Sequence, residues 1–106
     1  MEMEHPIYLT QLIYILEGQE EIFNRFEALV LPRIPAYRGE VLLRVRPDAL
    51  SLIEGTMDIP YEIHLVSFPD ETSLEQYTAD PVRKEFLHLK NASIRSSLLI
   101  KGKTVR

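Results

Sequence analysis

The chain contains no cysteine and no tryptophan, and only four of its 106 residues are glycine. Without cysteine the protein has no disulfide bond, no thiolate nucleophile and no cysteine-based zinc site. Four scattered glycines do not form the glycine-rich loop that cradles phosphate groups, so we predict no nucleotide site and no other cofactor.

An excess of positive charge is also missing. Lysine and arginine together number 12 against 16 aspartates and glutamates, which gives a formal net charge of −4. Phosphate backbones attract basic surfaces, so we predict that nucleic acid is not a partner. The first residues, MEMEHP, are acidic where a secretory signal is basic, and the apolar run that follows is interrupted by Thr10 and Gln11. We therefore expect a cytoplasmic protein with no membrane partner.

The three histidines are not spaced along the sequence as the ligands of a metal ion usually are. His5 precedes the first predicted strand, and His88 falls on the expected solvent side of the last helix, far from His64 in the sequence. We therefore predict no metal site.

The apolar residues are sufficient for a folded core. Hydrophobic residues make up 45% of the chain and charged residues 26%, which is typical of a globular protein. A length of 106 residues predicts a single domain over 1–106, with an ordered core over about 6–102.

Hydrophobic periodicity predicts four strands and three helical segments. The stretch 19–31 has apolar residues at three- and four-residue spacing and should end near Pro32, with Glu20, Glu21 and Glu27 on its solvated face. Asp70 and Asp80 are predicted to cap two further helices. The predicted strands are 7–16, 39–47, 61–68 and 96–102. The order β-α-β-β-α-β predicts an α+β, ferredoxin-like fold: a four-stranded antiparallel sheet with helices on one face and a bare opposite face.

Four segments carry a resemblance to a known family. They are YRGEVLLRV (37–45), LIEGTMDIPYEIHLVSFPD (52–70), SLEQYTADPVRKEF (73–86) and SSLLIKG (96–102). Together they resemble an uncharacterised, DUF1330-like branch of the dimeric α+β barrel superfamily. The resemblance places Arg44 on the strand arginine of that branch and Tyr77 on its helix aromatic, whereas Ser67 stands where members often carry a glutamate. It implies a homodimer that closes a barrel through the bare sheet faces, and it implies no particular activity.

Strand alternation predicts which side chains share a face. Because successive side chains point to opposite faces, we expect the more apolar set of each strand to cover the helices. These sets are Ile7, Leu9, Ile13 and Ile15; Val41, Leu43 and Val45; and Tyr61, Ile63, Leu65 and Ser67. The face away from the helices should then carry Tyr8, Thr10, Tyr14, Arg44, Glu62 and His64 amid Leu12, Leu42 and Val66.

A few polar groups in a mostly apolar cleft are typical of a small-molecule site. We predict that this face binds a small organic acid or phenolic ligand, and whether the protein is an enzyme stays open. In an enzyme such as a cofactor-free monooxygenase or an isomerase, His64 would transfer a proton, Arg44 would stabilise an anion and Tyr14 would position the ligand. The predicted ligand-binding residues are Tyr8, Thr10, Glu62 and Tyr77.

The same residues allow a structural interpretation. His64 could be a core histidine hydrogen-bonded to Glu62, to a tyrosine or to the partner subunit, and Arg44 could form a salt bridge across the dimer. Tyr8 and Tyr14 could be packing residues. The alternative function is therefore a non-catalytic structural or interaction module whose polar residues only stabilise the dimer.

Overall fold

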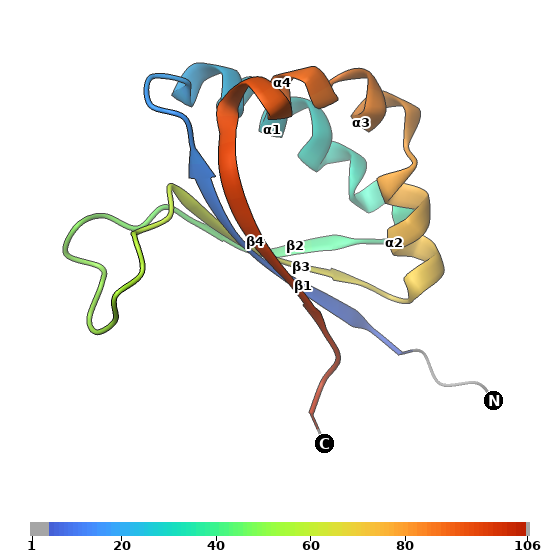
Figure 1. Cartoon of the computed structure of the whole chain (residues 1–106). Coiled ribbons are helices and arrows are strands. Elements are labelled where there is room, and N and C mark those ends of the chain that lie inside the picture. The colour runs from blue at the N-terminus through green and yellow to red at the C-terminus, as the bar shows by residue number, and fades with distance from the viewer. Residues whose placement is uncertain (1–4, 106) are drawn as a thin grey trace.

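The computed structural model describes residues 5–105 and shows one antiparallel sheet covered on one face by helices (Figure 1). The strands are β1 (Ile7–Ile15), β2 (Glu40–Val45), β3 (Glu62–Phe68) and β4 (Ile94–Gly102), in the spatial order β2-β3-β1-β4. The helices are α1 (Glu20–Val30), α2 (Glu71–Thr78), α3 (Pro81–Glu85) and α4 (Leu87–Ser93), with 3-10 turns at Leu31–Arg33 and Pro35–Tyr37. This confirms the predicted ferredoxin-like α+β fold.

The end of α1 and the starts of α2 and α3 lie where the sequence predicts, but the last of the three predicted helical segments is divided at Phe86 into α3 and α4. Helix α1 gives way to a 3-10 turn just before Pro32, because proline lacks the amide proton that continues an α-helix. The Asp70 carboxylate accepts a hydrogen bond from the Ser73 amide (2.7 Å), and the Asp80 carboxylate accepts one from the Arg83 amide (2.9 Å). These two N-caps start α2 and α3.

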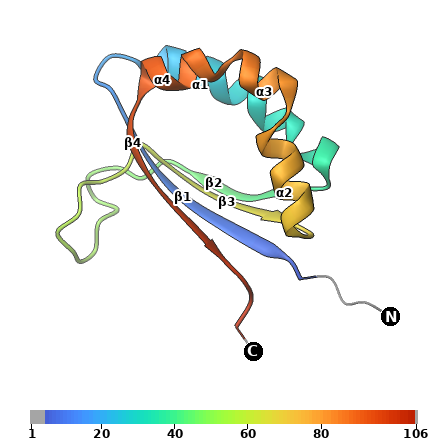
Figure 2. The ribbon, with the colours of Figure 1, turned by 45° about the vertical axis from the view of Figure 1, so that its right-hand side comes forward.

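One face of the sheet lies under the helices and the other is left uncovered, as the second view also shows (Figure 2). The core lies between the two layers and contains Phe23 and Phe26 of α1, Ile34, and Val66 and Phe68 of β3. Gly39 lets the start of β2 pass this core, because a Cβ atom there would lie 2.6 Å from atoms of both Ile34 and Phe68. Among residues 5–105, no helix is long and apolar enough to cross a membrane.

The predicted face was right for β1 and wrong for β3. Ile7 and Ile13 of β1 are buried under the helices as expected. In β3, however, the buried set is Glu62, His64, Val66 and Phe68, and Ile63 and Leu65 lie on the uncovered face. Both sets of this strand contain large apolar side chains, so hydrophobicity alone does not select between them. The buried set is the one whose polar groups find hydrogen-bond and charge partners in the folded protein.

A register shift explains the second discrepancy, in β2. Val41 pairs with Val66 on the helix side, but the register shifts before Leu43, which pairs with Leu65. Beyond this irregularity Arg44 pairs with His64, so the arginine lies on the helix side. The extra residue reverses the alternation of the strand, and Leu43 and Val45 therefore lie on the uncovered face instead of on the helix side as predicted.

Candidate functional site

A polar cluster with a buried centre lies where β2 and β3 pass under α1. Glu62 is completely buried, and both of its oxygens accept hydrogen bonds from arginines: Arg44 Nε to Oε2 (3.0 Å) and Arg46 Nε to Oε1 (2.7 Å). His64, two residues further along β3, points to the same face and its Nε2 is hydrogen-bonded to Glu62 Oε2. We call Arg44, Arg46, Glu62, His64 and Glu27 of α1 the polar cluster.

The two carboxyl groups of the polar cluster have opposite pKa shifts. Burial pushes the pKa of Glu62 upward, but hydrogen bonds from His64, Arg44 and Arg46 outweigh this effect and lower it to about 2. Burial dominates at Glu27 and raises its pKa from 4.5 to about 7. Glu62 is therefore ionised at neutral pH, whereas Glu27 is present in both the protonated and the ionised form.

Glu27 is a functional candidate that the sequence interpretation missed. It was predicted to be solvated, but it is only 4% exposed, and its Oε2 atom has no hydrogen-bond partner among the described residues. This oxygen lies 3.8 Å from His64 Nε2. A signal was available, because Glu27 falls four residues after Phe23 and three before Val30, within the apolar stripe of the helix.

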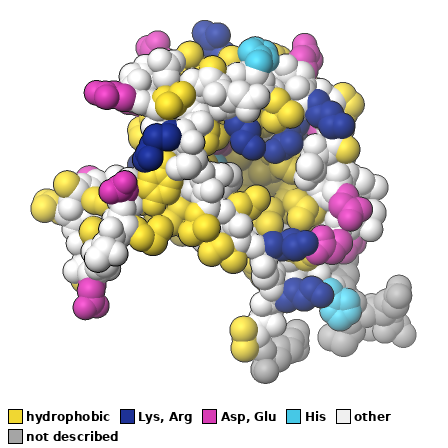
Figure 3. All heavy atoms as spheres, viewed as in Figure 1, with side chains coloured by type: hydrophobic (Ala, Val, Ile, Leu, Met, Phe, Trp, Pro, Cys, Tyr) yellow, Lys and Arg dark blue, Asp and Glu magenta, His cyan; other side chains and the backbone are white. Residues whose placement is uncertain are grey.

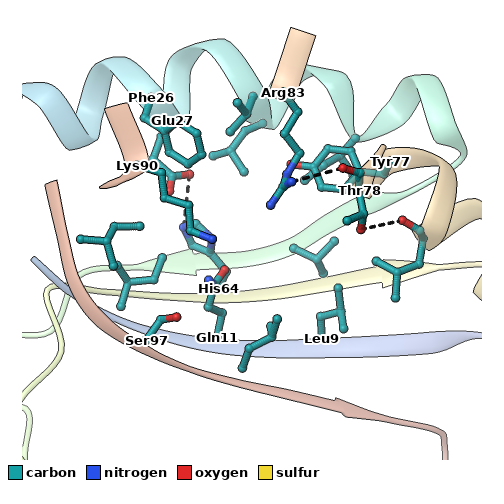
Figure 4. Close-up of a pocket in the computed structure, with 18 of the residues that line it drawn as sticks. Leu9, Gln11, Phe26, Glu27, His64, Tyr77, Thr78, Arg83, Lys90 and Ser97 are labelled. Atoms are coloured by element: carbon teal, nitrogen blue, oxygen red, sulfur yellow. Dashed lines mark hydrogen bonds and ion pairs between the residues drawn. The ribbon is translucent and has the colours of Figure 1, made fainter. Parts of the chain in front are cut away.

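The polar cluster adjoins a cavity of about 160 Å³ between the sheet and the helices. Figure 4 shows His64 and Gln11 reaching into it from the sheet and Glu27 from α1. Most of the wall is apolar, with Leu9, Phe26 and Val66 among its members. A cavity of about 150 Å³ can hold a benzene ring, so this one suits a single ring or a short carbon chain.

Two cations reach the same cavity from the helices. Figure 4 shows Arg83 of α3 and Lys90 of α4 pointing into it, and Figure 3 shows lysine and arginine side chains along the rim of a hollow lined by hydrophobic groups. Arg83 donates a hydrogen bond to the Thr78 carbonyl (3.3 Å) and lies over the Tyr77 ring. Within residues 5–105, no carboxylate lies within salt-bridge distance of either cation. Burial, together with the charge of Arg83, lowers the pKa of Lys90.

The predicted site residues do not converge on one face. His64 and Tyr77 line the cavity. Glu62 is hydrogen-bonded to His64, and Arg44 is hydrogen-bonded to Glu62. The other three, Tyr8, Thr10 and Tyr14, alternate with the helix-facing residues of β1 and so lie on the uncovered face. Tyr14 donates its hydroxyl proton to the Asp58 carbonyl (2.8 Å) and borders a second, shallower hollow beside the β2–β3 loop.

Glu27, Glu62 and His64 together offer three donor atoms within 4.8 Å of one another, which is close enough to hold a metal ion. Two guanidinium groups already bind both oxygens of Glu62, and they would repel a divalent cation there. The arrangement is better suited to holding a histidine in one tautomer: the ionised Glu62 accepts the proton of His64 Nε2, and the arginines fix the carboxylate.

Solved structures share the fold at low sequence identity. A protein of unknown function from Rhodopseudomonas palustris is 19% identical, with a TM-score of 0.82 over 97% of this chain and 85% of that chain. A dabb family protein with a ferredoxin-like fold from Mesorhizobium loti is 17% identical, with a TM-score of 0.68 over 97% of this chain and 100% of that chain. A dimeric ferredoxin-like protein of unknown function from Jannaschia sp. CCS1 is also 17% identical, with a TM-score of 0.71 over 93% of this chain and 99% of that chain.

These likenesses establish the fold class: the protein is a small ferredoxin-like α+β protein. No family model and no curated protein matches the chain. Membership of the dimeric α+β barrel superfamily and of its DUF1330-like branch stays a prediction.

Proposed function

We propose that the protein binds a small organic acid in the cavity between the sheet and the helices. The observation that carries the proposal is the pair of cations, Arg83 and Lys90, that enter an apolar cavity without a carboxylate partner among the described residues. A ligand carboxylate would supply the missing negative charge, and its hydrocarbon part would cover the apolar wall. Of the predicted site residues, His64 and Tyr77 are retained as ligand contacts, and Arg44 and Glu62 act through His64.

The expected result is selective binding of carboxylates that carry one ring. Benzoate and phenylacetate should raise the melting temperature of the protein, whereas the uncharged benzamide and phenylacetamide should not. Replacing Arg83 or Lys90 by glutamine should weaken carboxylate binding by about tenfold or more, because a hydrogen bond to a charged group contributes about 1.5–3 kcal/mol. Phenol belongs in the same panel, since a phenolate would meet the same two cations.

Lys84→Gln is the matched control, because this exposed lysine lies on α3 beside Arg83. The control should bind carboxylates as the wild type does. Equal shifts with acids and amides, or equal binding by the Arg83 variant and the control, would contradict the proposal. Those results would favour the alternative function, a structural module whose polar cluster only stabilises the fold.

We further propose that the uncovered sheet face pairs with a second copy of the chain. Two rows of cross-strand neighbours run across the middle of this face: Val45, Ile63, Leu12 and Leu98; and Leu43, Leu65, Thr10 and Ile100. Seven of these eight side chains are apolar. The adjoining β2–β3 loop, which projects from the body in Figure 1, also exposes apolar groups, and Ile53 is 97% exposed. Apolar patches of this kind mark protein interfaces, and the Jannaschia neighbour is described as dimeric.

The dimer is tested by placing a charge on the uncovered face, at Leu98 of the edge strand β4. Light scattering of the wild type at tens of micromolar (roughly the range in which an obligate dimer stays intact) should give twice the chain mass. Leu98→Glu should give a monomer or a large loss of dimer affinity, because it buries an unpaired charge against the second copy. Val105→Glu, in the exposed C-terminal segment, is the control and should remain dimeric. A monomeric wild type would overturn the proposal.

A further inference from the structure

Glu27 has no role in anchoring a carboxylate, yet among residues 5–105 it is the one buried carboxyl group that lines the cavity. Its side chain lines the cavity wall, and its Oε2 atom has no hydrogen-bond partner among residues 5–105. Glu62, by contrast, has both oxygens occupied by arginines. A buried polar atom without a partner destabilises a fold, so this oxygen is available to a ligand.

The His64 nitrogen that faces Glu27 is already used within the polar cluster. Because Glu62 is ionised, the hydrogen bond between them places a proton on His64 Nε2 and holds the ring in that orientation. Glu27 Oε2 lies 3.8 Å from the same nitrogen, within ion-pair distance, and makes no hydrogen bond to it. Glu27 therefore has an oxygen that no hydrogen bond occupies and that can take up or release a proton.

We propose that Glu27 is the catalytic acid and base of the cavity, and that the protein moves a proton to and from the carbon beside the carbonyl group of a small oxo acid. This inference rests on the proposed function, because Arg83 and Lys90 must hold the carboxylate of that acid. In the forward step a lone pair of the Glu27 carboxylate binds the C–H proton. The C–H electron pair forms a C=C bond, and the carbonyl π electrons move to oxygen, giving an enolate. The reverse step returns a proton from Glu27 to carbon, so no other reactant is consumed.

The surrounding charges suit this role near neutral pH. His64 and Glu62 face Glu27 from β3, Arg44 and Arg46 from β2, and Lys90 of α4 lines the same cavity. Burial, the largest effect, and the charge of Glu62 raise the pKa of the Glu27 carboxyl, the charges of His64 and the two arginines lower it, and the net pKa is about 7. A carboxylate with a pKa near the working pH is an effective base and, once protonated, an effective acid.

The test follows hydrogen exchange at C3 of phenylpyruvate, a one-ring oxo acid, in deuterated buffer by proton NMR. Wild-type protein should accelerate the exchange above the buffer rate, and Glu27→Gln should reduce the protein-dependent rate by about 100-fold or more. Glu21→Gln, an exposed position on the same helix, should exchange as the wild type does. Protein-independent exchange, or equal rates for the two variants, would overturn the role of Glu27.

Saturation-transfer NMR on the same samples separates this inference from the proposed function. Phenylpyruvate that binds without faster exchange overturns the catalytic role and leaves the binding site intact. A failure to bind phenylpyruvate, together with benzoate and phenylacetate, overturns both.

A measurement without ligand keeps the inference testable on its own. The Glu27 carboxyl carbon should titrate in the folded protein with a midpoint near 7, and a midpoint near the ordinary 4.5 would overturn the proposal. Because folding raises this pKa, Glu27 stabilises the fold most below pH 4.5, and that contribution is lost as the pH rises through 7. Glu27→Gln should remove this pH dependence.

Cobalt(II) absorption that depends on Glu27 would instead identify a metal site and overturn the proposal.

Discussion

Replacing Glu62 by alanine is expected to lower the free energy of unfolding by about 3 kcal/mol. Glu62 is completely buried and is the shared acceptor for Arg44, Arg46 and His64. Its removal leaves three donors without their partner at the edge of the core. The two arginine side chains are 39% and 44% exposed, so water recovers part of their solvation and the loss should stay near the lower end for buried pairs. Urea unfolding at a fixed protein concentration measures the change.

The pH dependence of this effect has a definite sign. Folding lowers the pKa of Glu62 from 4.5 to about 2, so its stabilising contribution is complete above about pH 5 and is lost as the pH falls toward 2. The difference between wild type and Glu62→Ala should therefore shrink over that range. Glu75→Gln, at an exposed position on α2, should change stability by no more than about 0.5 kcal/mol. A Glu62→Ala protein as stable as this control would show that the arginines do not depend on Glu62.

Replacing Phe68 by alanine should cost about 4 kcal/mol of unfolding free energy. This ring is 1% exposed, packs with Ile34 and Val66, and lies 5.5 Å from the Tyr77 ring, measured between centroids. Its removal leaves a cavity that the sheet and α2 cannot close, because both are fixed by their own hydrogen bonds. Chemical unfolding measures the loss.

The control for Phe68→Ala is Val105→Ala, since Val105 is 93% exposed. That change should stay within about 0.5 kcal/mol of the wild type. A Phe68→Ala loss below about 1 kcal/mol would mean that neighbouring side chains refill the space. The same change should also weaken benzoate binding, because Phe68 lines the cavity.

The two predictions concern different parts of one layer. Glu62 and Phe68 lie at opposite ends of β3 and face the same helices. Between them, His64 and Val66 contribute to the cavity. The strand is therefore held by charged hydrogen bonds at one end and by apolar packing at the other. We infer that these two sets of contacts keep the cavity walls in place.

The order of the elements could be predicted from the sequence. Period-two alternation marked the strands, three- and four-residue spacing marked α1, and Asp70, Asp80 and Pro32 marked helix ends. Each of these signals acts over a few neighbouring residues, through backbone geometry and local hydrogen bonds. They therefore do not depend on how distant segments pack.

The location of the site was decided by tertiary structure. In β3 both alternating sets contain large apolar side chains, and in β2 a register shift before Leu43 reversed the alternation. The sequence interpretation placed His64 and Arg44 together correctly but on the wrong face. It also treated Glu27 as solvated, although the helix stripe contained it.

The sequence by itself determined the four strands, three helical segments and their order, because propensity, capping and proline chemistry are local. Tertiary structure alone decided which face of β3 is buried. A glutamate and a histidine are excluded from a core unless distant cations neutralise them, and Arg44 and Arg46 reach Glu62 only after β2 pairs with β3. The energy of burying a charge depends on partners that are remote in the chain, and no local pattern records them.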